Sequence, residues 1–456
     1  MKTAFYLIAM IGVLLACKSE DPEITYDENE EFSGGELTTF DLSENAFGHS
    51  ASNLSFDEEN DFVIGNSFFR SNWTTAPATA TARDGLGPIF NASSCGGCHP
   101  KDGRGIPPGN YGEPLNGLLI RLSGVNGKDE PVYGGQLQDK AILGAKPEAK
   151  VKIKYEDISG QYEDGTSWSL RKPVYEFTEW AYGPVESGFL FSPRVGNQLP
   201  GMGLLEAISE TDIRANTDEN DFNADGISGR ANEVWSETQQ RIMLGRFGWK
   251  ANQPNLLEQT AGAFNGDIGI TSNIFPNDHV TDAQQELKSL PNGGSPEISD
   301  ENLRQVVFYL QTLQVPARRD FRKEVVLKGK KLFSELECIK CHISEFTTDN
   351  THPIEVLRNQ KIRPYTDLLL HDMGPELADG RPDHLANGSE WRTPPLWGIG
   401  MIQTVNGHQF LLHDGRARNI EEAILWHNGE AVRSQKAFLK LSKTDRENLI
   451  AFVESL

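Results

Sequence analysis

The cysteines of this chain are the residues whose type and spacing point most directly to chemistry. Four of the five form two copies of a CxxCH pattern, which are Cys95, Cys98 and His99, and Cys338, Cys341 and His342. In this pattern the two thiols can add across the two vinyl groups of a haem, and the adjoining histidine can bind the iron. We therefore expect two covalently bound c-type haems, with His99 and His342 as their proximal ligands.

Two other uses of paired cysteines compete with haem attachment. A redox pair of the thioredoxin type needs no histidine after the second cysteine. A zinc site can be built from four thiolates of two CxxC turns, but the two pairs lie about 240 residues apart and each brings a histidine that such a site does not require. Haem attachment uses every residue of both motifs.

The fifth cysteine, Cys17, ends an apolar run that follows a positive start at Lys2 and is too short to span a bilayer. Its context, Leu14-Leu15-Ala16-Cys17, resembles a bacterial lipobox. We expect a signal peptide over 1–17, export, lipidation of Cys17, and attachment to the outer membrane on its periplasmic or surface face. An ordinary signal peptide cut nearby is the alternative. Residues 18–50 are acidic and predict a flexible tether.

The acidic composition bears on the partners. The formal net charge is −22, which argues against nucleic acid because a polyanion needs a basic face. It favours a basic partner, and an electron-donor protein such as a small cytochrome or a cupredoxin fits. Any membrane contact is expected through the lipid anchor only.

Paired markers recur in the same order in both halves, which indicates a duplication. A glycine precedes each haem motif, Gly65 and Gly329, and a glycine-spaced apolar segment follows each motif, with Gly203 and Gly400. Asn255 and Asn419 each resemble a helix N-cap, and each half closes with an amphipathic helix that a serine opens, over 299–313 and 442–456.

These markers place one domain over 51–316 and a second over 317–456, with a linker at 315–319. Alternating residues within 118–191, as in 118–122 and 150–155, predict short β-strands. The expected fold class is mainly α, with two tandem cytochrome c-like domains and a small β-rich insertion in the first.

Several segments carry a resemblance to a known family. The stretches 370–374, 391–396 and 412–417 resemble the C-terminal domain of the bacterial di-haem cytochrome c peroxidase superfamily. The stretches 203–207 and 245–251 resemble its subgroup of di-haem oxidoreductases, also called thiol oxidoreductases. The resemblance implies that hydrogen peroxide or a related small oxidant is reduced at the open N-terminal haem, with electrons delivered through the C-terminal haem. A non-catalytic di-haem electron-transfer lipoprotein is the alternative function.

The resemblance also implies the sixth ligands. In the peroxidases a methionine follows the Glu-Glu-Ala helix start; here that position is His427, so His342 and His427 are expected as a bis-histidine pair. The rivals are Met373, Met401, His371 and His413, or a surface role for His427. The duplicated position is Ala263, which cannot bind iron, and we expect the His99 haem to be open unless Met202 caps it.

Peroxide cleavage needs a group that moves a proton and a group that holds the oxygens. The stretch 258–262 resembles the family segment that bears a glutamine, which implies Gln259. The position of the family glutamate is Gly269, so the nearest carboxylate, Asp267, is the candidate and Glu206 the reserve. Trp249 is the candidate electron relay. Helix capping, loop solvation and ordinary core packing are the alternatives for these residues.

A calcium ion is the last expected ligand. Asp221, Asn223 and Asp225, followed by Gly226, have the alternating oxygen ligands of a calcium loop. The twelfth position is Asn232 instead of the usual glutamate, and a solvated acidic turn is the alternative.

Overall fold

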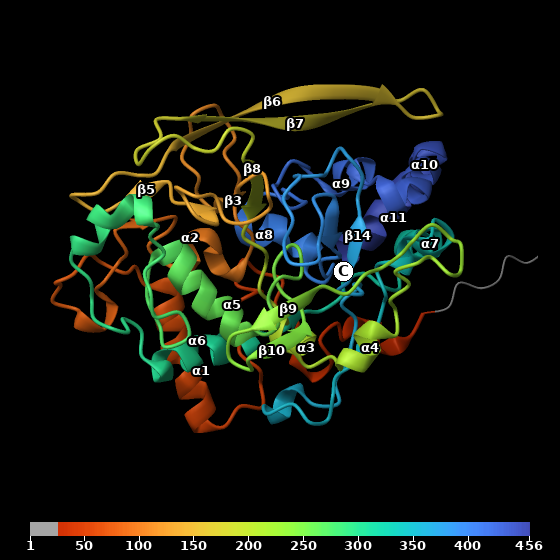
Figure 1. Ribbon diagram of the computed structural model, residues 1–456. Coiled ribbons are helices and arrows are strands. Elements are labelled where there is room, and N and C mark those ends of the chain that lie inside the picture. Colours follow the sequence, from red (N-terminus) through yellow and green to blue (C-terminus); the bar gives the residue numbers. More distant parts are fainter. Residues whose placement is uncertain (1–25) are drawn as a thin grey trace, which may run out of the picture.

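The computed structural model describes residues 26–456 (Figure 1). The segment 1–25, and with it the predicted lipidation site Cys17, lies outside the described residues. The α-helices of the described part are α1 Phe56–Arg70, α2 Cys95–Cys98, α3 Met202–Glu206, α4 Glu210–Arg214, α5 Leu256–Ala263, α6 Asp300–Gln311, α7 Glu324–Glu335, α8 Ile402–Asn406, α9 Ile420–Trp426, α10 Val432–Lys440 and α11 Lys443–Ser455. Short 3₁₀ turns connect many of them, and a π-helical turn, η5 Phe264–Ile268, follows α5.

The strands form several small sheets instead of one large sheet. They are β1 Thr38–Thr39, β2 Ile89–Phe90, β3 Leu118–Ser123, β4 Gln136–Leu137, β5 Lys140–Ala141, β6 Lys150–Gln161, β7 Ser167–Thr178, β8 Leu190–Val195, β9 Glu233–Ser236, β10 Arg241–Leu244, β11 Val315–Pro316, β12 Phe346–Thr347, β13 Lys361–Ile362, β14 Leu370–Asp372 and β15 Glu390–Arg392. β3 pairs with β4 and β8, and β6 pairs with β7, both in antiparallel register. The strands predicted at 118–122 and 150–155 are thus confirmed.

The expected mainly α class with two tandem domains is wrong. Helix makes up 31% and strand 18% of the structure, and the strands are spread over several sheets. Many of the strands are only two to four residues long and join loops around the haem motifs. Because such short pairs leave no clear periodicity in the sequence, the pattern of the long helices dominated the expectation.

The duplicated glycines have the same structural role in both halves. α1 packs on α6 in the first half, and α7 packs on α11 in the second. A Cβ atom at Gly65 would collide with the carbonyl of Gln305 in α6, and one at Gly329 with the carbonyl of Asn448 in α11. Glycine therefore allows the two backbones to touch at each crossing.

The predicted helix starts are confirmed by their caps. Ser299 accepts a hydrogen bond from the N–H of Asn302, and Ser442 from that of Asp445. Asn255 and Asn419 do the same for α5 and α9. These caps satisfy backbone donors that the first turn leaves without partners.

A long hairpin of the first half reaches over the second half. Figure 1 shows β6 and β7 running across the top of the molecule above α9 and α10. At its tip Tyr162, 5% exposed, donates to Glu421 at 2.6 Å, and the guanidinium of Arg446 lies 3.7 Å from the centre of its ring. Asp164 accepts a hydrogen bond from Arg446 at 2.9 Å. This contact, called the clasp below, joins the two halves of the chain at positions far from residues 315–319.

The expected flexible tether over 18–50 is wrong where the structure describes it, from residue 26 on. β1 pairs in parallel with β11, which lies in the predicted linker. Phe47 is fully buried in the core of the C-terminal half, and Glu30 pairs with the buried Arg318. An acidic residue of this segment thus pairs with a buried cation. Composition alone cannot distinguish acidic residues that form such pairs from acidic residues of a solvated, flexible segment.

Within 26–456, the structure has no helix that is both long and apolar enough to cross a bilayer.

Candidate haem sites and active site

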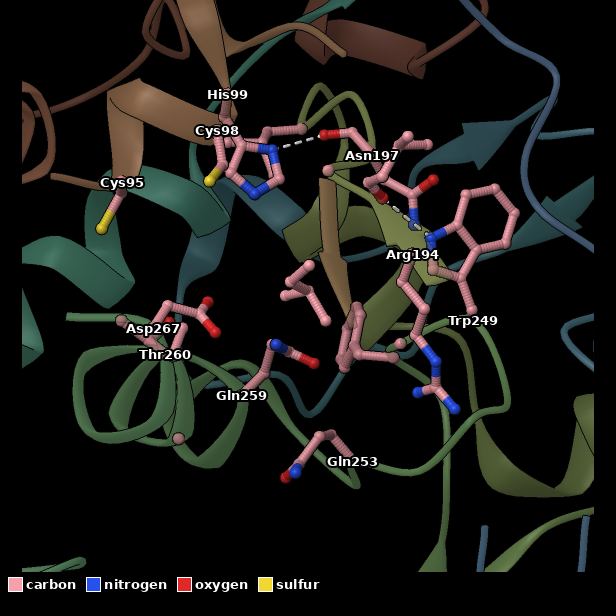
Figure 2. A pocket seen from close by; sticks show the side chains of 18 of the residues that line it. Cys95, Cys98, His99, Arg194, Asn197, Trp249, Gln253, Gln259, Thr260 and Asp267 are labelled. Atoms are coloured by element: carbon pink, nitrogen blue, oxygen red, sulfur yellow. Dashed lines mark hydrogen bonds between the residues drawn. The ribbon is translucent and has the colours of Figure 1, made fainter. Parts of the chain in front are cut away.

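The first CxxCH motif borders a cavity of about 260 Å³ in the N-terminal half. Native interiors hold few voids larger than one water molecule, so a cavity of this size needs an occupant. Cys95, Cys98 and His99 all line it, and Figure 2 shows them on one side with Gln259 on the opposite side. The arrangement fits a flat prosthetic group between the histidine and the glutamine.

The ring of His99 is oriented by the backbone. Its Nδ1 lies 2.6 Å from the carbonyl oxygen of Asn197, and because a carbonyl only accepts, Nδ1 carries the hydrogen. This leaves Nε2 with a free lone pair, as a metal-bound histidine requires. Among the described residues that line this cavity, His99 is the only histidine, and Met202 and Ala263 line it as well.

Both predicted catalytic side chains lie at this cavity. Gln259 comes from α5, and Asp267 comes from the π-helical turn that follows. Such turns occur frequently at functional sites because they change the direction of side chains. Asp267 points into the cavity (Figure 2) and accepts a hydrogen bond from Gln136 at 2.7 Å. Burial raises the pKa of Asp267 above its ordinary value, against the effect of Gln136 and of nearby Arg121.

The second motif borders a separate cavity of about 190 Å³ in the C-terminal half. It is lined by Cys338, Cys341 and His342, and by His427 just after α9. The Nδ1 atom of His342 lies 3.0 Å from the carbonyl oxygen of Tyr365, and that of His427 lies 2.6 Å from the carbonyl oxygen of Ala423. Both rings therefore keep Nε2 free, as in His99.

The two rival histidines at this cavity differ: carboxylates hold both nitrogens of His371, whereas His413 makes a stacking contact. Both ring nitrogens of His371 face carboxylates, with Nε2 2.8 Å from Asp367 and Nδ1 2.7 Å from Glu430. His413 stacks on Trp391, with ring centres 3.7 Å apart. The described part of the chain holds one cluster of convergent ligand atoms, Cys341, Asp367 and His371. Because Cys341 belongs to a haem motif and His371 has no free nitrogen, this cluster does not fit a separate metal ion.

Met401, another rival, is buried but does not line the cavity, whereas Met373 lines it. No contact distinguishes Met373 from His427 directly. The free Nε2 of His427 is the geometric argument for the histidine.

The four thiols are unpaired, and burial raises their pKa values. None of the four forms a disulfide. Burial raises the pKa of Cys95, Cys98 and Cys338 to about 12. A thioredoxin-type pair instead needs a thiol whose pKa is lowered, so the redox-pair alternative has no support here.

Trp249 lies in the wall between the two cavities and lines both. Its indole N–H donates to the carbonyl of Val195 at 2.9 Å. The ring of His413 lies edge-on to it, with centres 6.5 Å apart. Gln198, Arg392, Pro394 and Pro395 complete the shared wall. Trp249 therefore lies where an electron relay between two haems is expected.

Three arginines test whether the cavities suit haem: Arg104 and Arg392 are buried, and Arg121 is half-buried. Arg104, Arg121 and Arg392 line the cavities, and none of them forms an ion pair with any residue in 26–456. Burial lowers the pKa of Arg104 to about 9 and that of Arg392 to about 10. Arg104 and Arg392 donate to backbone carbonyls, and the buried Nε of Arg121 has no hydrogen-bond partner among the described residues. An anion bound in the cavities would offset the cost of these charges. Each haem carries two carboxylates, and the donor set therefore fits two haems.

Sequence reasoning missed Gln136 and these arginines. Gln136 comes from β4 and meets Asp267 across 131 positions of the chain. An isolated glutamine or arginine has no spacing signal, and only the folded chain shows what it faces.

The remaining predictions lie away from the cavities. Glu206 is half-buried and accepts a hydrogen bond from the N–H of Leu256 at 2.8 Å, so it caps α5. It lines neither cavity. In the predicted calcium loop, Asp221 accepts from the N–H of Gly226, and Asp225 from that of Ile227. Asp225 also lies 3.2 Å from Lys340 of the second haem motif. Calcium binding stays a prediction that no contact of this loop supports.

Comparisons with known proteins agree with this site at the level of the family. No curated protein matches the chain. A solved structure of hydrazine synthase from Kuenenia stuttgartiensis, pressurised with 20 bar xenon, is 16% identical; the match covers 36% of this chain and 57% of that chain, with a TM-score of 0.23. A TM-score this low carries no argument about the fold.

The family described as "Di-haem oxidoreductase, putative peroxidase" matches residues 26–114 and 130–456. The matched segments contain both CxxCH motifs and nearly all residues that line the two cavities. The chain belongs to this family of di-haem oxidoreductases.

Proposed function

We propose that this protein is a peroxidase-like enzyme that reduces hydrogen peroxide at the N-terminal haem site with electrons delivered through the C-terminal one. The observation that carries the proposal is the difference between the cavities. Among their described lining residues, the first has one histidine, His99, whereas the second has four: His342, His371, His413 and His427. Of these four, His342 and His427 are held through Nδ1 by backbone carbonyls and keep Nε2 free, whereas carboxylates hold both nitrogens of His371. A haem with a free axial face binds and activates a small oxidant, and a haem held on both faces transfers electrons.

The residues opposite His99 supply what peroxide cleavage needs from a protein. Asp267 is a carboxyl with a raised pKa, which suits a group that takes and returns a proton. Gln136 holds one of its oxygens and so fixes its orientation. The amide of Gln259 points into the cavity (Figure 2), where it can donate to the bound oxygens.

Trp249 is proposed as the path for electrons between the two sites, because it lines both cavities. Arg104, Arg121 and Arg392 are proposed to hold the haem carboxylates. Covalent attachment through the four thiols follows the CxxCH pattern.

The alternative is an electron-transfer lipoprotein with both haems closed. Spin resonance of the ferric holoprotein separates the two functions. We expect one high-spin signal that shifts with cyanide, beside one low-spin signal, and two low-spin signals would support the carrier. Met202→Leu is the matched control. If the His99 haem has an open face, the spectrum of this variant equals that of the parent protein. If Met202 caps that haem, the variant loses the cap and gains a high-spin signal that the parent lacks.

We further propose export with a lipid anchor at Cys17 and an electron donor that is a small basic protein. The lipobox-like ending and the net charge of −22 support these two points. Labelling with radioactive palmitate, compared with a Cys17→Ser variant, tests the anchor.

A further inference from the structure

A buried tyrosine, Tyr309, lies near the first haem motif but does not line the cavity of that motif. Tyr309, in α6, is 0% exposed, and its hydroxyl donates a hydrogen bond to Oδ1 of Asp102, which is 0% exposed as well. The other oxygen of Asp102 accepts from Arg70 at 2.7 Å. The phenol therefore faces a carboxylate that a cation holds in place.

This pair lies close to the proximal histidine of the N-terminal haem. Asp102 follows His99 by three residues, and its N–H donates to the carbonyl of His99 at 3.1 Å. The ring of Phe69 packs near both Tyr309 and His99. Its centre lies 5.4 Å from the ring centre of Tyr309 and 6.3 Å from that of His99. One aromatic ring thus connects the tyrosine to the histidine.

The backbone is strained where it turns Asp102 inward. Lys101 has φ of 52° and Asp102 has φ of 61°, so two successive residues other than glycine adopt the left-handed conformation. This conformation is unfavourable for residues other than glycine, and strain of this kind clusters at functional sites. The chain maintains an unfavourable turn that places a carboxylate against a phenol.

We propose that Tyr309 is a redox-active tyrosine that supplies one electron to the N-terminal haem site when peroxide arrives and no external donor has delivered electrons. The proposal rests on the proposed function. Hydrogen peroxide takes two electrons and two protons to give two waters; Tyr309 supplies one electron, the di-haem centre the other, and solvent the protons. The phenolic proton moves to Asp102, which leaves a neutral tyrosyl radical and a neutral carboxylic acid.

The surroundings suit both states of this pair. Burial raises the pKa of Tyr309, with Asp102 adding to the effect, so the phenol is neutral before oxidation and needs an acceptor when it loses its proton. After the transfer, Arg70 loses its ionised partner, but its side chain is 49% exposed and water can solvate its charge. The donor's next electron and the proton on Asp102 then restore the phenol.

The test is spin resonance of the donor-free holoprotein frozen after mixing with hydrogen peroxide, with peroxide consumption measured on the same samples. Ring-deuterated tyrosine identifies a tyrosyl signal by its narrowed hyperfine structure. We expect the signal in the parent protein and its loss in Tyr309→Phe. Tyr133→Phe is the matched control, because Tyr133 is 1% exposed and its hydroxyl donates to the carbonyl of Gly183, which cannot take up a proton.

Asp102→Asn gives a second readout that keeps the tyrosine and an oxygen acceptor but removes the proton acceptor. Loss of the signal in Asp102→Asn, with both haems still present in the absorption spectrum, would support the proton transfer; an unchanged signal would refute it. Peroxide consumed without a radical at Tyr309 refutes this inference alone. If no peroxide is consumed, the proposed function fails, and this inference fails with it because the tyrosine would lack its oxidant.

Discussion

Replacing Asp267 with asparagine removes the carboxyl that we propose transfers the proton and preserves the shape of the side chain. The amide oxygen of the new side chain can still accept from Gln136, whose nitrogen lies 2.7 Å from the carboxylate of Asp267, so the cavity wall should stay in place. Proton transfer by a positioned side chain contributes about 10²–10⁴-fold to a rate, which is roughly 3–5 kcal/mol at about 1.4 kcal/mol per factor of ten. We expect Asp267→Asn to lower the rate of peroxide consumption by this factor, measured by stopped flow.

Asp139 provides the matched control. It is another carboxyl whose pKa is raised by burial, and Asn91 and Lys140 hold it, but it does not line the cavity. Asp139→Asn should therefore leave the rate close to that of the parent protein. A rate for Asp267→Asn within about twofold of the parent, far below the usual contribution of such a group, would refute the role of Asp267. An equal loss in Asp139→Asn would show a general effect of buried charge instead.

The pH profile adds an independent measure of the same carboxyl. Gln136 favours the ionised form of Asp267, and a hydrogen bond to a charged group contributes about 1.5–3 kcal/mol. Because Gln136 lowers the pKa of Asp267, Gln136→Leu should raise that pKa further. The acid limb of the rate profile should therefore move to higher pH.

Three further outcomes are expected. His427→Met should raise the reduction potential of the C-terminal haem, because thioether ligation raises it; an unchanged potential in a spectroelectrochemical titration would contradict ligation by His427. Burial raises the pKa of Glu148 from 4.5 to about 8, so the folded state binds the proton of Glu148 more tightly than the unfolded state does. The stability that this proton contributes is complete below about pH 4.5. Between about pH 4.5 and about pH 8 the free energy of unfolding should fall by roughly 1.4 kcal/mol per pH unit. Urea unfolding should show this slope in the parent and not in Glu148→Gln. Tyr162→Ala should lower the free energy of unfolding by about 3–5 kcal/mol, while Tyr111→Ala, at a 54% exposed site, should change it little; equal changes would argue against the clasp.

The sequence predicted those parts of the site that follow a local pattern. The two CxxCH motifs, the caps at Ser299 and Ser442, and the paired glycines all depend on residues within one turn or one helix crossing. Gln259 and Asp267 were placed by resemblance, and the structure brings both to the cavity of His99.

The parts that the sequence did not predict depend on contacts between distant segments. The reach of the β6–β7 hairpin to Arg446 and the packing of 26–50 against Arg318 join positions more than 250 residues apart. The mainly α expectation was wrong for a related reason: strands of two residues exist because their partners are near in space, and a period of two cannot be recognised over two residues.

The wall that both cavities share has a consequence for the kinetics of electron transfer. Trp249 borders both sites at once, so an electron crossing between them needs no domain rotation or loop closure. The rate of that step should be independent of solvent viscosity, in contrast to gated enzymes in which a lid must move first. A substitution at a residue of this wall would also change the lining of both cavities at once.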